Sequence, residues 1–191
     1  MRTLCILIFS LLSLSPGFGQ RLVQVEIDPE SKLEIHGTTN INSFACIQED
    51  ELQEEALQVE VLSSDQKWML NNANLGVPLV KFDCGIQQMT NDFHETLKSR
   101  EYPYIKMKIN SIVPTSNSEE FLANVTIDLA GEQNSYLIPV EVEDFNGKIH
   151  CLGEKFIDFE DFNLAPPVKF MGLVRVHDQI QIRFNLILRA S

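Results

Sequence analysis

The residues of this chain that could carry out chemistry are few and lie far apart in the sequence. Glu160 and Asp161, adjacent carboxylates in the segment DFEDFNL, could serve as a general acid and base, but a polar turn between aromatic residues explains them better. The histidines, the residues most suited to bind zinc, show no ligand spacing. They are His36, His94, His150 and His177. We therefore predict neither a catalytic pair nor a metal site.

The common catalytic and cofactor motifs are also absent from the sequence. It contains no GxSxG nucleophile elbow, no HExxH zinc motif, no CxxC pair and no glycine-rich phosphate loop. We expect a protein that is not an enzyme and that uses no cofactor. Its function must then depend on what its secondary structure elements enclose.

The N-terminal segment predicts export. Arg2 supplies a positive charge, residues 4–14 form an apolar run, and the small-residue triplet GFG follows. This pattern is typical of a secretory signal peptide, here residues 1–19 with cleavage before Gln20. The apolar run is too short to span a bilayer comfortably and no later run is longer, so we predict no transmembrane segment. We expect the domain formed by residues 20–191 to be periplasmic or secreted.

The chain is acidic, with 27 Asp and Glu against 15 Lys and Arg and a formal net charge of −12. Removal of the predicted signal peptide takes away one basic and no acidic residue, which makes the charge −13. A negative surface repels phosphate groups, so we expect no nucleic-acid partner and no polybasic membrane dock. Solubility alone explains a charge of this kind.

Most of the chain alternates between apolar and polar residues with a period of two, which predicts strands with one buried and one wet face. Roughly eight such segments follow one another, separated by short polar turns such as Asn146-Gly147, a strong hairpin signal. They predict one antiparallel all-β domain, and a sandwich and a closed barrel fit the pattern equally. The clearest strand is the last, with its apolar face formed by Ile180, Ile182, Phe184, Leu186 and Leu188.

One amphipathic helix interrupts this pattern within the segment FDCGIQQMTNDFHETLKSREYPYIKMKI, residues 82–109. Met89, Phe93 and Leu97 recur every four positions and therefore share one stripe of the helix. A helix of about ten residues is marginal alone in water, so this stripe must pack on other elements. It either lies on the outside of the sheet or plugs the mouth of a barrel.

The ends of this helix have sequence signals of their own. We expect Thr90 or Asp92 to cap its start, with Glu95 completing a capping box after Asp92. Lys98 lies favourably near the negative end of the helix, and Pro103 prevents its continuation.

Three cysteines follow the predicted signal peptide. Cys46 and Cys84 each end an aromatic-led strand segment, and we predict that they form a disulfide, which an exported chain permits. Cys151 lies in an apolar strand segment, where a buried small hydrophobic side chain is expected rather than a reactive thiol.

Four segments carry motifs in a fixed order along the chain. Residues 31–44 read SxLxIxGTxNxNSF, residues 92–105 read DxHxxLKSxxYPxI, residues 125–140 contain VTI and PV, and residues 161–164 read DFNL. In this order they resemble the YceI-like family of exported, lipocalin-like barrels associated with polyisoprenoid binding. The family has DFGL where Asn163 stands here, and the glycine expected after Thr126-Ile127 is displaced to Gly131.

The resemblance implies an antiparallel eight-stranded lipocalin-like barrel with the short amphipathic helix near its mouth. It also implies a polyisoprenoid or other long apolar lipid as the ligand, although Asn91 stands where many members have an arginine and weakens the case for a phosphorylated head group. We predict that the ligand is contacted by apolar side chains on the helix and the surrounding strands. These residues are Phe44, Phe93, Leu97, Ile105, Met89 and Trp68.

Two other functions fit the sequence less well. A secreted, non-enzymatic interaction module would have a solid interior, in a barrel or a sandwich, because eight-stranded barrels are often filled by side chains. An enzyme acting on an isoprenoid-like substrate would need clustered polar residues inside the barrel, which the alternation does not supply. The sequence is compatible with a monomer and with a homodimer.

Overall fold

The structure is a computed structural model of the chain, and it describes residues 19–48, 56–64, 67–117 and 119–190. The predicted signal peptide lies outside these residues except for Gly19, which begins the first strand. None of the helices in these ranges is long and apolar enough to cross a membrane. The elements are β1 (Gly19–Ile27), β2 (Lys32–Thr39), β3 (Ser43–Gln48), β4 (Ala56–Ser64), β5 (Lys67–Asn71), β6 (Asn74–Pro78), η1 (Leu79–Lys81), β7 (Phe82–Asp83), α1 (Gln87–Thr96), β8 (Tyr104–Pro114), β9 (Glu120–Leu129), β10 (Glu132–Phe145), β11 (Lys148–Asp158), η2 (Phe159–Phe162), β12 (Val168–Lys169), η3 (Phe170–Gly172) and β13 (Val174–Ala190).

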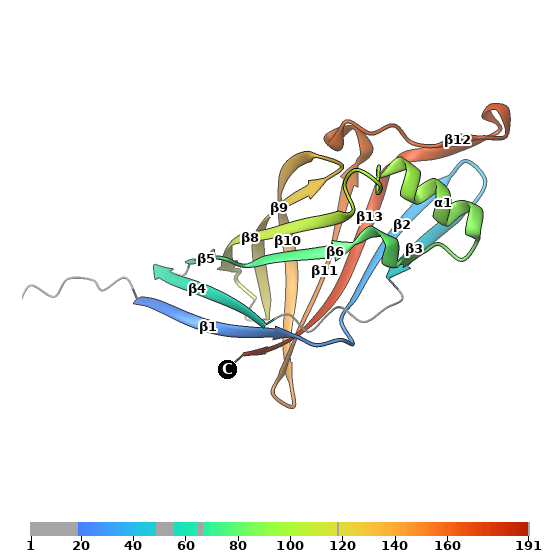
Figure 1. The fold of residues 1–191 in the computed structure, drawn as a ribbon. Helices are drawn as coiled ribbons and strands as arrows, with labels where there is room; N and C mark the ends of the chain where they lie inside the picture. The colour runs from blue at the N-terminus through green and yellow to red at the C-terminus, as the bar shows by residue number, and fades with distance from the viewer. Residues whose placement is uncertain (1–18, 49–55, 65–66, 118, 191) are drawn as a thin grey trace, which may run out of the picture.

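Eight strands form a closed ring of antiparallel sheet (Figure 1). Their order is β1-β4-β5-β8-β9-β10-β11-β13, and β13 pairs back with β1 through Ile27 and Leu188. Closure leaves no free edge on this ring, which is how barrels avoid edge-to-edge aggregation. The predicted eight-stranded lipocalin-like barrel is therefore confirmed, and the sandwich is excluded.

Two long strands change partners along their length and so give the barrel two different halves. β13 pairs with β2 over residues 176–185 and with β1 near its C-terminal end. β8 pairs with β6 at its start and with β5 near Ile112. The half that contains α1 is therefore walled by β2, β3, β7 and β6, whereas β1, β4 and β5 wall the opposite half (Figure 1).

The predicted alternation is confirmed most clearly in β9. Ala123, Val125, Ile127 and Leu129 are buried, whereas the residues between them are more exposed. In β8 the alternation is interrupted by a bulge between Ile109 and Ser111, which brings a serine into the interior. A bulge of this kind bends the strand and increases its twist, as a closed barrel requires.

Three hairpins of the barrel turn through two residues with positive φ, the requirement of a type I′ turn. They are Ala130-Gly131 between β9 and β10, Asn146-Gly147 between β10 and β11, and Met171-Gly172 between β12 and β13. Asn163, which stands at the glycine of the family motif, has φ +50°, a left-handed conformation that Asn adopts more readily than most residues.

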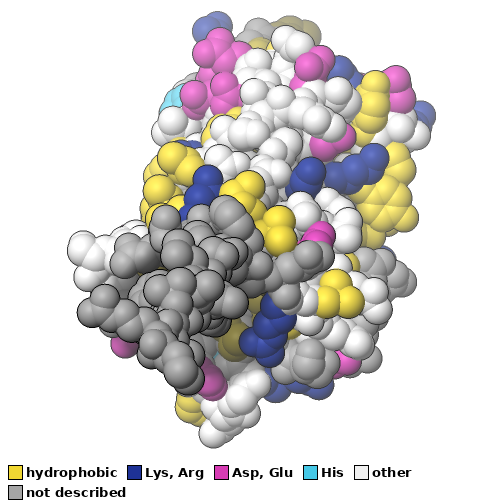
Figure 2. Space-filling view, turned by 90° about the vertical axis from the view of Figure 1, so that its left-hand side faces the viewer, with side chains coloured by type: hydrophobic (Ala, Val, Ile, Leu, Met, Phe, Trp, Pro, Cys, Tyr) yellow, Lys and Arg dark blue, Asp and Glu magenta, His cyan; other side chains and the backbone are white. Residues whose placement is uncertain are grey.

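The outer face that carries the left-hand strands of Figure 1 is turned toward the viewer in Figure 2. Hydrophobic side chains lie there in separate patches, interspersed with basic and acidic ones. A mixed surface of this kind is typical of a protein face in contact with water.

Candidate functional site

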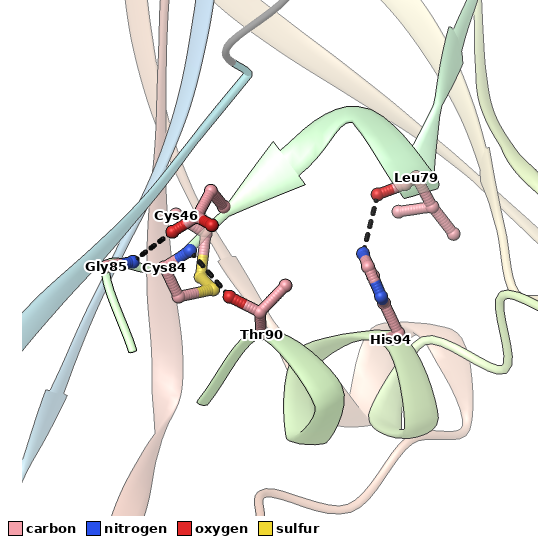
Figure 3. The surroundings of a disulfide bond; sticks show 7 residues. Cys46, Leu79, Cys84, Gly85, Thr90 and His94 are labelled. Atoms are coloured by element: carbon pink, nitrogen blue, oxygen red, sulfur yellow. Dashed lines mark hydrogen bonds between the residues drawn. A yellow bond between two sulfur atoms is a disulfide. The ribbon is translucent and has the colours of Figure 1, made fainter. Parts of the chain in front are cut away.

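The helix that was predicted to border the interior begins earlier than its capping signals indicated. Its N-cap is Ile86, which has an extended backbone and makes no side-chain capping hydrogen bond. Thr90 lies inside the helix, where its buried hydroxyl accepts a hydrogen bond from the Cys84 N–H at 3.0 Å (Figure 3). Asp92 pairs with Lys169 instead of capping the helix. Both predicted caps were wrong because these side chains have partners outside the helix.

Two contacts hold the helix against the barrel. His94 donates a hydrogen bond from Nε2 to the Leu79 carbonyl at 2.9 Å, which places its proton on Nε2 (Figure 3). The rings of Phe93 and Phe82 lie 5.4 Å apart, centre to centre. Leu97, at the end of the apolar stripe, is buried. The stripe therefore packs toward the barrel interior.

The disulfide between Cys46 and Cys84 joins the barrel wall to the start of this helix (Figure 3). Cys46 lies in β3, and Cys84 follows β7, which pairs with β3 through Gln48 and Phe82. A cross-link that closes 38 residues restricts the unfolded chain and so stabilises the fold. It also fixes β3 next to the helix that it faces.

A cavity of about 280 Å³ lies beneath α1, bounded by β2, β3 and the inner face of β13. Its wall is almost entirely apolar, and its few polar side chains belong to elements at the open end, near the β2–β3 turn, α1 and β12. The lining residues are Ile35, Thr39, Ile41, Asn42, Phe44, Cys46, Ile86, Gln88, Met89, Asp92, Phe93, Thr96, Leu97, Ile105, Ile127, Leu129, Ile157, Phe159, Pro167, Lys169, Val174, Val176, Ile180 and Ile182.

The structure brings together most of the residues predicted to contact a ligand. Five of them line the cavity: Phe44, Met89, Phe93, Leu97 and Ile105. Their role as ligand contacts stays a prediction, whereas their position on one wall is a feature of the fold.

Trp68 does not belong to this group. It lies in β5 opposite Ile112 of β8, and its ring packs near Phe121 at 5.8 Å between centres. Ile105 is seven residues away along β8, which corresponds to roughly 23 Å of extended strand. Trp68 therefore lies in the opposite half of the barrel, away from the cavity wall that the other five residues share. Its role as a ligand contact stays a prediction.

The cavity wall also contains residues that the sequence did not single out. Ile127, Ile157, Val176 and Ile180 come from β9, β11 and β13, strands distant from the helix in sequence. The alternation of the last strand placed Ile180 on an apolar face, but alternation alone cannot show which strand ends approach the helix.

Gly37 determines the position of one wall residue. It pairs with Phe44 across β2 and β3, and a Cβ atom on Gly37 would clash with three carbons of the Phe44 ring. The ring therefore lies directly over the glycine. A larger residue at this position would push Phe44 out of its place on the cavity wall.

An ion pair joins two of the elements around the cavity opening. The Lys169 ammonium donates to the Asp92 carboxylate at 2.8 Å, and both side chains are partly exposed. The hydrogen bond to Asp92 raises the pKa of Lys169, so the lysine stays charged throughout the physiological pH range. The pair connects α1 to β12 across the opening.

Asp161, one of the two carboxylates considered as an acid–base pair, has a structural role. Asp158 and Asp161 form a capping box around η2, and Asp161 accepts a hydrogen bond from the Tyr136 hydroxyl at 2.7 Å. Burial and this contact raise the pKa of Tyr136.

Burial also raises the pKa of the Cys151 thiol to about 11, which keeps it protonated. Within the described ranges, no three His, Cys, Asp or Glu side chains come together as a metal site.

A second hollow, of about 460 Å³, lies beside β6 and β8. Its wall includes Tyr104, Lys106, Lys108, Asp128 and Gln133, all at least partly exposed. Charged and amide groups at such a wall interact better with water than with a hydrocarbon. The smaller cavity beneath α1 is therefore the better candidate for an apolar ligand.

Comparison with known proteins gives a match in structure only. No protein-family model and no curated protein matches the chain. Among solved structures, BcnA of Burkholderia cenocepacia superposes with a TM-score of 0.64 at 16% identity, covering 83% of this chain and 96% of that one. A polyisoprenoid-binding domain from Saccharophagus degradans, implicated in plant cell wall breakdown, gives 0.57 at 12%, covering 87% and 98%.

A YceI protein of Campylobacter jejuni is also similar, with a TM-score of 0.53 at 14% identity, covering 68% of this chain and 78% of that one. At such identities a structural likeness shows a shared fold. This chain has the fold of the YceI-like proteins, which confirms at the level of the fold the resemblance indicated by its motifs.

Proposed function

We propose that this chain is a YceI-like binding protein that is exported and holds an apolar isoprenoid or other lipid chain inside its barrel, as a carrier or sequestering protein. The observation that carries the proposal is the apolar cavity beneath α1, which opens between the helix, the β2–β3 turn and β12. Sites for small apolar ligands are typically preformed, with few polar groups at the entrance.

The size and chemistry of the cavity favour an extended hydrocarbon. Each methylene group transferred from water to an apolar wall contributes about 0.8 kcal/mol. The cavity volume of about 280 Å³ lies just below the roughly 300–1,000 Å³ that ligand pockets occupy. We therefore infer that one segment of a chain enters the barrel and that the polar head stays at the opening.

Two further observations support the proposal. A solved domain of the same fold is described as polyisoprenoid-binding. The disulfide between Cys46 and Cys84 suits an oxidising compartment, in agreement with the predicted signal peptide. An interaction module with a solid interior would not need the cavity, and Asp161, one of the two carboxylates considered for catalysis, is occupied in the η2 cap.

Native mass spectrometry after exposure to geranylgeraniol tests the proposal. We expect a one-to-one complex with the unaltered protein and its loss in Met89→Trp, because the larger ring fills space beside the helix. Gln87→Trp is the matched control, since Gln87 lies on the same helix, is exposed and lies outside the described cavity wall. Persistent absence of a complex, or a complex that Met89→Trp leaves unchanged, would contradict the proposal.

A further inference from the structure

The opening of the cavity is surrounded by apolar side chains that face solvent. We call Ile41, Ile86, Val168, Met171 and Leu173 the apolar rim; each is more than half exposed, and Met171 is fully exposed. Ile41 and Ile86 also line the cavity. Lys169, next to Val168, and Val174, next to Leu173, line it as well. The rim is therefore continuous with the apolar wall of the cavity.

Hydrogen bonds fix the rim elements to one another. The Asn40 side chain donates to the Leu173 carbonyl at 2.9 Å and accepts from the Arg175 N–H at 2.9 Å. These bonds tie the β2–β3 turn, which carries Ile41, to the β12–β13 hairpin, which lies at the same end of the barrel as α1 (Figure 1). The ion pair of Asp92 and Lys169 ties the hairpin to α1. The rim is a fixed frame around the opening.

The conformation of Met171 shows that folding alone does not account for this residue. Met171 has φ +54° and ψ +34°, and Gly172 has φ +93°, which is the geometry of a type I′ turn. Asn, Asp and Gly are preferred at its first central position, and long apolar side chains are disfavoured at positive φ. The β10–β11 turn contains Asn146-Gly147, whose φ values of +55° and +78° are similar. Met171 is thus both strained and fully exposed.

The charge around the opening differs from that of the chain as a whole. Residues 37–48, 84–91 and 162–177 supply the rim and contain no Asp or Glu, although the chain has 27 of them. Lys169 and Arg175 lie within the third segment, and Asp92, just beyond the second, is paired with Lys169. The segments that supply the rim therefore add no negative charge of their own to the repulsion of anionic headgroups.

We propose that the apolar rim docks on the surface of a lipid bilayer, with Met171 and Leu173 entering the interfacial region. The proposal rests on the proposed function, because docking there would let a hydrocarbon chain pass between bilayer and cavity without crossing water. A few exposed apolar side chains with two basic residues give weak, reversible attachment. Such attachment differs from the polybasic dock that the net charge disfavours.

Flotation with vesicles of phosphatidylcholine and phosphatidylglycerol tests this docking. We expect the unaltered protein to float with the vesicles. The double variant Met171→Asn with Leu173→Ser should show about tenfold less bound protein, because it lacks the two apolar side chains that enter the bilayer. Phe145→Ser is the matched control, since Phe145 is 65% exposed, comparable with 74% for Leu173, but lies at the β10–β11 turn. It should float like the unaltered protein.

Two further measurements separate the possible failures. Met171→Asn alone should raise the midpoint of thermal unfolding, so that lost flotation cannot come from unfolding. Native mass spectrometry with geranylgeraniol should show that the double variant still takes up the chain from solution. If the unaltered protein takes up geranylgeraniol but does not float with the vesicles, the docking proposal is overturned and a protein partner at the rim is favoured. Equal loss in Phe145→Ser also overturns it, whereas flotation without uptake overturns the proposed function.

Discussion

At the end of the barrel opposite to α1, a buried carboxylate lies among cations, whereas the side chains around the α1 opening are mostly uncharged and many are apolar. Asp28, in the β1–β2 turn, is 3% exposed and pairs with Lys148 at 2.8 Å and with Arg189 at 2.5 Å. It also accepts a hydrogen bond from the Glu30 N–H at 3.0 Å. These contacts tie the turn to β11 and β13.

The two ends of the barrel are held by different kinds of contact. Ion pairs that connect three elements fix one end, and a buried charge is tolerated there because it is paired and hydrogen-bonded. At the other end, the disulfide holds the start of α1 against β3, and the Asp92–Lys169 pair joins α1 to β12. These elements surround a cavity instead of a filled core. Four sets of substitutions test the roles assigned to residues at the two ends.

The largest effect is expected from removal of the disulfide. The double substitution Cys46→Ser with Cys84→Ser should lower the free energy of unfolding by ~2–4 kcal/mol, because the unfolded chain regains the freedom of the closed loop. Denaturant unfolding measures the change. Cys151→Ser is the control and should have a smaller effect, since this half-buried thiol is free. A protein whose stability is unaffected by the double change would contradict the role given to the cross-link.

A smaller effect is expected from Gly37→Ala, which should displace the Phe44 ring and destabilise the protein by about 1–3 kcal/mol, the usual result of overpacking. Gly153→Ala is a matched control, because a Cβ there clashes with the Phe184 ring in the same way. Phe184 is absent from the described cavity wall. Both variants should lose stability, but only Gly37→Ala should also lose ligand in native mass spectrometry.

The ion pairs of Asp28 should make the stability of the protein depend on pH. Hydrogen bonds with Arg189 and Lys148 hold the pKa of Asp28 well below its usual range. Its stabilising contribution is therefore complete above the unfolded pKa of about 3.9 and is lost as the pH falls below that value. Asp28→Asn should lower the midpoint of thermal unfolding near neutral pH and flatten its decline in acid. Parallel pH curves for the two proteins would contradict this assignment.

The smallest effect is expected from exchanging the central residues of the two hairpin turns. Met171→Asn should stabilise the protein by less than about 1 kcal/mol, because Asn tolerates positive φ. Asn146→Met, the reciprocal change, should destabilise it by a similar amount. Thermal unfolding measures both. Stabilisation by Asn146→Met would show that the backbone strain assigned to Met171 is absent.

Local patterns predicted most of the secondary structure and part of the cavity. The alternation of β9 and the stripe of Met89, Phe93 and Leu97 follow directly from side-chain periodicity, which depends on neighbouring residues only. The choice of a barrel over a sandwich came from the order of motifs and could not come from periodicity. The position of Trp68 illustrates the limit, because it depends on which part of β8 pairs with β5.

Tertiary contacts explain the other differences. Thr90 is a good capping residue by type, but its hydroxyl is used by the Cys84 backbone, so the helix starts before it. The wall residues Ile127 and Ile157 could not be assigned because barrel closure brings β9 and β11 opposite the helix.

Nuclear Overhauser contacts between isotope-labelled geranylgeraniol and the protein test the central claim most directly. We expect contacts from the hydrocarbon to the cavity residues Phe93, Leu97, Ile105 and Ile127. We expect none to Trp68 or Phe121 in the opposite half of the barrel. Contacts confined to the charged hollow beside β6 and β8, or no contacts with the protein at all, would contradict the binding of an apolar chain inside the barrel.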